Sequence, residues 1–107
     1  MTIARGPVFA CNLNAIQPAD RPRYSELVKR LRAAMSSRVE LTDGYSYLVT
    51  TAAISLPEIA EWIAMERVCC PFLTFQLEVS GTNDPLLILS GPSGAKALLD
   101  QELSPIS

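Results

Sequence analysis

Two adjacent cysteines, Cys69 and Cys70, follow Glu66 at spacings of three and four residues. On a helix, these spacings bring side chains together on one face. The surrounding segment has helical periodicity, and Glu66 falls in the middle of its apolar stripe, close to Trp62 and Ile63. A carboxylate on an apolar helix face needs a partner or a function, because burying an unpaired charge is costly. We therefore predict a site at Glu66, Cys69 and Cys70.

The chemistry that this trio favours is the binding of a soft metal or metalloid ion. Negative surroundings stabilise a cation, and the bound cation deprotonates the thiols. Cys69 and Cys70 are the predicted ligands. Glu66 is predicted to be a third ligand or a neighbouring charge, and Arg67 to tune that charge. Cys11 adds a third sulfur if the fold brings it close. A closed structural zinc site is disfavoured, since the chain has three cysteines and no histidine.

A second hypothesis is a thiol redox or thiol-transfer enzyme with Cys70 as nucleophile and Cys69 as resolving thiol. Such an enzyme needs a thiol pKa clearly below the ordinary value of about 8.5. The C-terminal end of a helix and the charge of Glu66 both raise thiol pKa values instead. A disulfide between neighbours is also strained, because adjacent Cα atoms lie about 3.8 Å apart. The sequence therefore favours binding over catalysis.

A third hypothesis is a structural or partner-binding domain, because buried free cysteine often behaves as a small inert hydrophobe. Glu66 is then a structural charge that pairs with Arg67 or with an arginine of the first helix. Met65 and Val68 point away from the predicted core face and indicate a homodimer contact. The three hypotheses remain open on the sequence alone.

Composition indicates one small domain over residues 1–107, because 49% of the residues are hydrophobic and 19% are charged. The net charge of −2 argues against a general nucleic-acid binder, which is usually basic. Six basic residues are nevertheless grouped in one stretch, which we interpret as the solvated face of a helix. They are Arg21, Arg23, Lys29, Arg30, Arg32 and Arg38.

The expected location of the protein in the cell follows from three features that the sequence does not have. No apolar run approaches the roughly 20 residues that cross a bilayer. The first residues do not have the basic stretch and apolar core of a signal peptide. Three cysteines, two of them adjacent, fit no ordinary disulfide framework. We therefore expect a cytoplasmic protein with no membrane partner.

Periodicity predicts the elements around the site. An apolar strand is expected at 8–13, and Asp20 is a candidate N-cap for a helix whose apolar face runs from Tyr24 to Met35. A hairpin is expected over 38–51 with its turn at Asp43-Gly44. The later predicted elements are a helix capped by Ser55 and Glu58 and ending near Cys70, strands at 72–79 and 86–89, and a final helix that opens at Gly91-Pro92 and continues to Leu103.

This order of elements predicts an α+β fold, a two-layer sandwich. Its antiparallel sheet has four to five strands in two hairpin-plus-helix units, and about three helices cover it.

Four segments resemble a group of short, uncharacterised bacterial proteins built around an E-R-x-C-C-P-F motif. They are Asp43-Gly44-Tyr45, Glu61-Trp62-Ile63, Glu66-Arg67-x-Cys69-Cys70-Pro71-Phe72 and Leu89-Ser90-Gly91-Pro92-x-Gly94. The resemblance covers roughly residues 20–103. It supports the choice of the cysteine pair as the site, implies no particular activity and leaves the function open.

Overall fold

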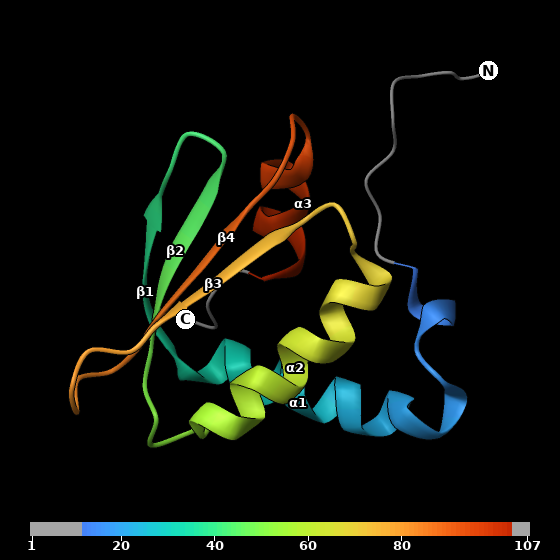
Figure 1. The fold of residues 1–107 in the computed structure, drawn as a ribbon, viewed down its shortest axis with the longest axis horizontal. Helices are drawn as coiled ribbons and strands as arrows, with labels where there is room; N and C mark the ends of the chain where they lie inside the picture. Colours follow the sequence, from blue (N-terminus) through green and yellow to red (C-terminus); the bar gives the residue numbers. More distant parts are fainter. Residues whose placement is uncertain (1–11, 104–107) are drawn as a thin grey trace.

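The computed structural model describes residues 12–103 of the chain. In chain order its elements are two 3-10 helices (Leu13–Ala15 and Pro18–Asp20), α1 (Arg21–Ala34), β1 (Met35–Glu40), β2 (Gly44–Val49), α2 (Leu56–Cys69), β3 (Thr74–Glu78), β4 (Leu86–Ser90) and α3 (Ala95–Glu102). The four strands form one antiparallel sheet in the order β1-β2-β4-β3 (Figure 1). The predicted α+β fold with an antiparallel sheet and three helices is confirmed.

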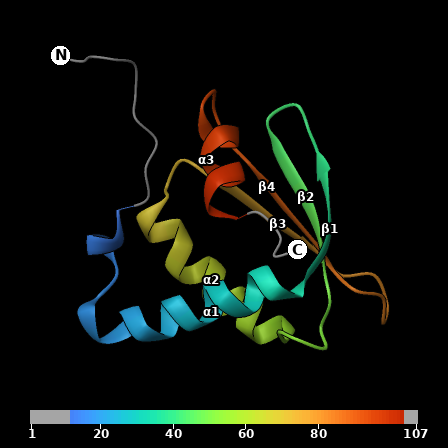
Figure 2. The same ribbon diagram turned by 180° about the vertical axis from the view of Figure 1, so that it is seen from behind.

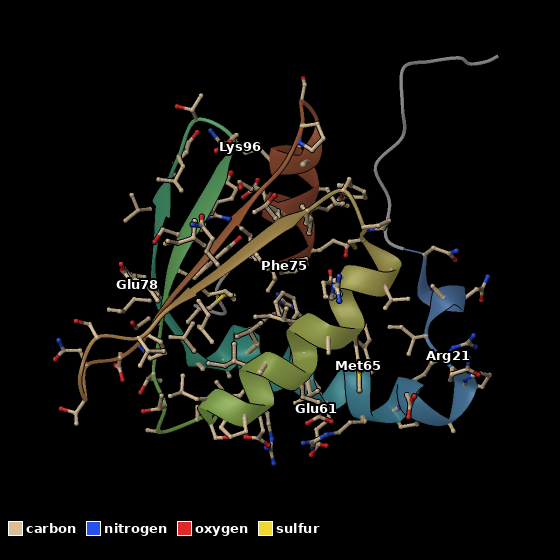
Figure 3. The ribbon with its side chains drawn as sticks, viewed as in Figure 1. Arg21, Glu61, Met65, Phe75, Glu78 and Lys96 are labelled. Carbon is tan, nitrogen blue, oxygen red and sulfur yellow. The ribbon has the colours of Figure 1, made fainter. Side chains whose placement is uncertain are left out.

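The strand register explains why the helices gather on one face of the sheet. Tyr45 of β2 lies opposite Leu89 of β4, and Leu89 lies opposite Phe75 of β3, so the three side chains share a face. Trp62 of α2 packs edge-on against Phe75, with ring centroids 5.9 Å apart. Phe75 of β3 is labelled in Figure 3. On the same face, Lys96 of α3 lies over the ring of Tyr45. The two ribbon views show how the helices lie against the sheet (Figure 2). The buried core residues lie between this face and the helices.

Helix α2, which carries the cysteine pair, begins with the predicted capping box. The backbone N–H of Glu58 donates to the Ser55 hydroxyl, and the backbone N–H of Ser55 donates to the Glu58 carboxylate. Ion pairs then hold the helix against α1. Arg23 of α1 lies 2.8 Å from Glu61, and Arg30 contacts Glu58. The packing of α1 on α2 is what brings α1 side chains to the site.

Several predicted boundaries were wrong. Met35 has extended backbone angles and opens β1, so α1 ends at Ala34. Asp20 stands before α1 but makes no side-chain capping bond, because its own backbone is already helical. The final helix opens at Ala95 rather than at Pro92, because Gly94 at φ 100° reverses the chain just before it. β3 spans only Thr74–Glu78 of the predicted 72–79.

The strand predicted at 8–13 lies almost wholly outside the described residues. Its last residue, Leu13, begins a 3-10 helix. Next to it, the backbone N–H of Asn12 donates to the carbonyl oxygen of Cys69, at 3.0 Å. The described N-terminal segment is therefore hydrogen-bonded to the end of α2, at the cysteine pair.

Candidate metal centre

The last turn of α2 brings Glu66, Cys69 and Cys70 together inside the protein. Their exposed fractions are 5%, 1% and 0%. One ligand atom from each residue, two sulfurs and a carboxylate oxygen, lies within 4.8 Å of the others. The helical spacing places Cys69 beside Glu66. Cys70 is the C-cap residue, with non-helical backbone angles, and its backbone N–H bond to Glu66 holds it next to the same residue.

Each sulfur lies beside a different oxygen of the same carboxylate. The Sγ atom of Cys69 is 3.7 Å from Oε1 of Glu66, and the Sγ atom of Cys70 is 3.2 Å from Oε2. The two sulfurs are 3.8 Å apart. An ion between them would therefore meet two soft ligands and one hard, negative ligand.

Main-chain hydrogen bonds fix the chain on both sides of the pair. The backbone N–H of Cys70 donates to the carbonyl oxygen of Glu66 at 2.7 Å, which closes the final turn of α2. The carbonyl oxygen of Cys70 accepts from Leu73 at 3.2 Å, and that of Cys69 accepts from Asn12. The carbonyl oxygens of Glu66, Cys69 and Cys70 thus each accept a backbone hydrogen bond.

Tyr24 completes the cluster from α1. Its hydroxyl donates a hydrogen bond of 2.6 Å to Oε1 of Glu66. The helical period placed Tyr24 on the apolar face of the first helix but did not predict this contact. The sequence did contain a signal for this contact: Tyr24 has a hydroxyl on one apolar helix face, and Glu66 has a carboxyl group on another. Buried polar groups tend to form hydrogen bonds with each other.

Burial shifts the protonation of the cluster toward its neutral form. Desolvation raises the pKa of Glu66, and the hydrogen bond from Tyr24 partly offsets this shift. Desolvation, followed by the charge of Glu66, raises the pKa of Cys69 to about 12. Cys69 is therefore a thiol at neutral pH. It becomes a thiolate only when a cation compensates the charge.

The two cysteines differ in their bonding state. Cys69 is a free thiol, whereas the sulfur of Cys70 is disulfide-bonded in this structure. Ion binding through both sulfurs therefore belongs to the reduced protein. Cys11, the predicted third sulfur, lies outside the described residues, and its contribution stays a prediction.

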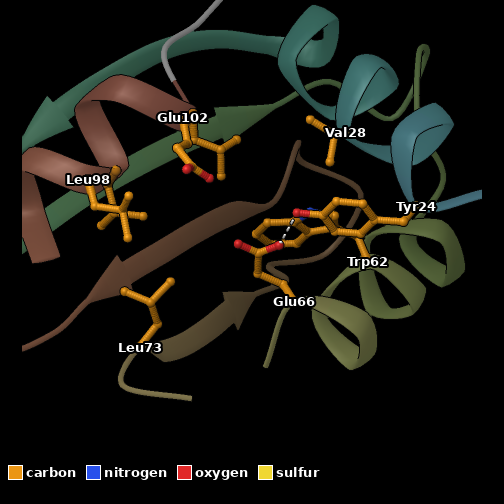
Figure 4. Close-up of a pocket in the computed structure, with 9 residues that line it drawn as sticks. Tyr24, Val28, Trp62, Glu66, Leu73, Leu98 and Glu102 are labelled. Carbon is orange, nitrogen blue, oxygen red and sulfur yellow. Dashed lines mark hydrogen bonds between the residues drawn. The ribbon is translucent and has the colours of Figure 1, made fainter. Parts of the chain in front are cut away.

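A small pocket adjoins the carboxylate on the side of α3 (Figure 4). Glu66 and Tyr24 form part of its wall, and Glu102 of α3 points into it from the opposite side. Desolvation also raises the pKa of Glu102. The remaining lining is apolar and consists of Val28, Trp62, Leu73, Leu98, Leu99 and Leu103. The sequence did not predict this pocket, because its walls come from three helices and from the segment before β3.

Other predicted residues lie away from the cluster. Arg67 is exposed, and α1 contributes Tyr24 to the surroundings of Glu66, while Arg23 and Arg30 of α1 pair with Glu58 and Glu61. Val68 is 54% exposed. It lines a second groove with Met65, between α2 and the segment before α1. A homodimer through these two residues stays a prediction.

Comparison of the chain with protein-family models, with curated proteins and with solved structures finds no match. Among the described residues, no helix is long and apolar enough to cross a membrane. The geometry of the cluster is therefore the basis on which a function is assigned.

Proposed function

We propose that the reduced protein binds a soft metal or metalloid ion through Cys69 and Cys70. Glu66 serves as the third ligand or as the balancing charge. The observation that carries this proposal is the buried cluster itself, with two sulfurs and a carboxylate oxygen within 4.8 Å of one another. Soft thiolate ligands select soft ions, and a carboxylate beside them favours positive charge.

The surroundings of the pair support binding over thiol catalysis. A catalytic thiol is normally stabilised as thiolate by positive neighbours or by a helix N-terminus. Here the pair lies at the end of α2, and the carboxyl group of an acid, Glu66, lies beside both sulfurs. The pKa of Cys69 is raised to about 12, so this thiol keeps its proton at neutral pH. A redox enzyme is therefore the weaker candidate.

The proposal places the protein in a reducing compartment such as the cytoplasm, where both thiols are available.

The test is a titration of the fully reduced protein, in a non-thiol reductant, with mercuric, cadmium, zinc and arsenite ions. We expect tight, stoichiometric binding of the thiophilic ions. We expect this binding to be lost in a Cys69→Ser/Cys70→Ser variant that keeps the circular dichroism spectrum of the parent. Cys11→Ser, which removes the one cysteine outside the described residues, tests the predicted third sulfur. Any loss of affinity in it would measure a third sulfur.

Glu66→Gln separates the role of the carboxylate from that of the sulfurs. The amide has almost the same shape but no charge, so we expect weaker binding with the same stoichiometry. Equal binding in the parent and in the double cysteine variant would show that the two cysteines do not bind the ion and serve only as packed core residues. Partner binding would then be the better interpretation.

A further inference from the structure

The cysteine content of the chain limits the disulfide partner of Cys70. The chain contains three cysteines, and Cys69 is a free thiol. Cys70 is disulfide-bonded, and the residue is 0% exposed. A sulfur buried this deeply is out of reach of a second chain. The candidate partner within the chain is therefore Cys11, which lies outside the described residues.

A main-chain hydrogen bond independently brings the neighbour of Cys11 to the cysteine pair. The backbone N–H of Asn12 donates to the carbonyl oxygen of Cys69 at 3.0 Å, and both ribbon views show the first described residues beside the end of α2 (Figure 1, Figure 2). Cys11 directly precedes Asn12 in the sequence, and Cys70 directly follows the acceptor residue. Consecutive Cα atoms are about 3.8 Å apart, and disulfides join Cα atoms about 4.4–6.8 Å apart. A bridge between the two cysteines that flank this bond is therefore within reach of the backbone.

A free thiol lies next to the disulfide. The Sγ atoms of Cys69 and Cys70 are 3.8 Å apart. Thiol–disulfide exchange needs a thiolate, whereas burial raises the pKa of Cys69 to about 12 and keeps its proton in place at neutral pH. Exchange would also have to join two neighbouring residues, whose Cα atoms are closer together than a disulfide normally spans. The disulfide of Cys70 is thus protected from the nearest thiol.

The disulfide decides how many sulfurs the cluster can offer to an ion. A sulfur in a disulfide is not a thiolate, the form that binds metal ions. The oxidised cluster therefore has one usable sulfur, that of Cys69. Reduction frees the sulfur of Cys70, which lies 3.2 Å from Oε2 of Glu66, and so restores the pair.

We propose that a disulfide between Cys11 and Cys70 locks the ion site, and that reduction of this disulfide by a small thiol such as glutathione opens the site. This inference rests on the proposed function, whose site it regulates. The protein then binds its ion in a reducing compartment and loses that ability under oxidation.

The opening reaction is an ordinary thiol–disulfide exchange. A glutathione thiolate attacks the sulfur of Cys11, since that of Cys70 is buried, and Cys70 leaves as a thiolate that takes up a proton. A second glutathione thiolate displaces Cys11 from the mixed disulfide, and Cys11 is protonated in turn. Two glutathione molecules lose two electrons and two protons and become one disulfide, and the two cysteines gain them. Oxidised glutathione closes the lock by the reverse reaction.

The first test maps the bond. Protein is equilibrated with oxidised glutathione, desalted, denatured and alkylated, and its peptides are analysed by mass spectrometry without reduction. We expect the peptides of Cys11 and Cys70 to be joined, with one alkylated thiol in the parent and three after reduction. Cys69→Ser should keep the bridge, and its matched control Cys70→Ser should lose it. A bridge that persists in Cys70→Ser, an alkylated Cys11 in the oxidised parent, or a disulfide between two chains would overturn the inference.

The second test titrates the oxidised and the reduced protein with cadmium. Loss of a group that merely orients a metal ligand costs about 10–100-fold in affinity, so loss of a ligand sulfur should weaken cadmium binding at least about tenfold in the oxidised parent. In Cys11→Ser, Cys70 stays a thiol under both conditions, and we expect the ratio of the two affinities to fall to about one. This ratio is taken within one variant, so a third sulfur does not affect it. Cys11→Ala repeats the test if the serine variant folds poorly.

The possible failures are distinguishable. Equal cadmium affinity of the oxidised and the reduced parent would overturn the lock and leave the proposed function standing. A ratio that stays at ten or more in both Cys11 variants would also overturn the lock, because oxidation would then act through another group. Absence of thiol-dependent binding in the fully reduced parent would remove the proposed function, and the lock with it, even where the bridge is found.

Discussion

The hydroxyl of Tyr24 and the carboxylate of Glu66 are joined by a 2.6 Å hydrogen bond between two helices, although the two residues are 42 positions apart in the sequence. This bond lowers the pKa of Glu66 against the larger, opposite effect of burial. A tyrosine on α1 thus controls how easily the acid beside the two sulfurs ionises. The stability of the fold should show this coupling as a dependence on pH.

Replacing Tyr24 with Phe should destabilise the protein more at pH 8 than at pH 4. The folded-state pKa of Glu66 is already raised, so stability decreases as pH rises from about 4.5, the usual pKa of the acid, through the folded value. Losing the hydroxyl raises that folded pKa further. We expect a loss of about 1–3 kcal/mol where Glu66 is ionised, measured by urea unfolding at both pH values.

Tyr47→Phe is the control for this experiment. The Tyr47 hydroxyl is buried, and its charged neighbour is Arg38 rather than Glu66. Its removal should not change the pH profile between 4 and 8, because burial raises the pKa of Tyr47 to about 12. Equal losses at both pH values in Tyr24→Phe would show that the Tyr24 bond does not act through the ionisation of Glu66.

Ion binding should release protons and should tighten as pH rises. Cys69 keeps its proton up to a pKa of about 12, so any ion that binds this sulfur must displace that proton at neutral pH. Apparent affinity should increase about tenfold per pH unit for each thiol proton displaced. Calorimetry in two buffers of different ionisation enthalpy counts the protons directly.

The matched comparison is Cys69→Ser, which should lower the proton count by about one for cadmium. An unchanged count would mean that Cys69 is not a ligand. A count that falls to zero would show that Cys70 contributes no proton without its neighbour.

Local sequence signals predicted the elements that carry the site. Ser55 and Glu58 mark the start of α2, and Pro71 marks its end, since the residue before a proline avoids the helical region. Between these limits, the helical period placed Glu66 on the buried face, as the structure confirms. The burial of Cys69 follows from the same pattern.

Contacts between distant elements could not be predicted in this way. The bond from Tyr24 to Glu66 depends on how α1 lies across α2, which the ion pairs of Arg23 and Arg30 help to set. Glu102 faces the pocket only because α3 returns over the sheet. Periodicity describes one element at a time, so it carries no information about such crossings.

The capping box should affect stability without affecting the ion site. In Ser55→Ala, the backbone N–H of Glu58 loses its acceptor, and we expect a loss of about 0.5–2 kcal/mol in the free energy of unfolding. Ser55 is at the opposite end of α2 from the cysteines, so cadmium affinity should stay the same. Thermal unfolding and a titration on one sample measure both quantities.

Ser93→Ala, in the exposed turn before α3, is the control for a generic serine loss and should be nearly neutral. A parallel fall in cadmium affinity in Ser55→Ala would contradict this separation. It would mean that the start of the helix and the site unfold as one unit.

Gly44 is required for a close approach of two strands rather than for an unusual backbone angle. Asp43-Gly44 indicated a hairpin turn, and Gly44 is the first residue of β2. Among the described residues, the glycines with positive φ are Gly81 and Gly94. A Cβ atom at Gly44 would lie 1.8 Å from the carbonyl oxygen of Leu89. This oxygen belongs to the backbone of β4, so it cannot move away without a shift of the strand.

Gly44→Ala should therefore destabilise the protein by well over the roughly 1 kcal/mol of an average substitution, because it forces β2 away from β4 at the centre of the sheet. Gly81→Asn is the matched comparison. Gly81 has a φ of 58°, and a Cβ atom added there would have no other atom within 4 Å; asparagine also tolerates that angle. Urea unfolding should find Gly81→Asn within about 1 kcal/mol of the parent. A Gly44→Ala protein of parental stability would show that the two strands are not this close in solution.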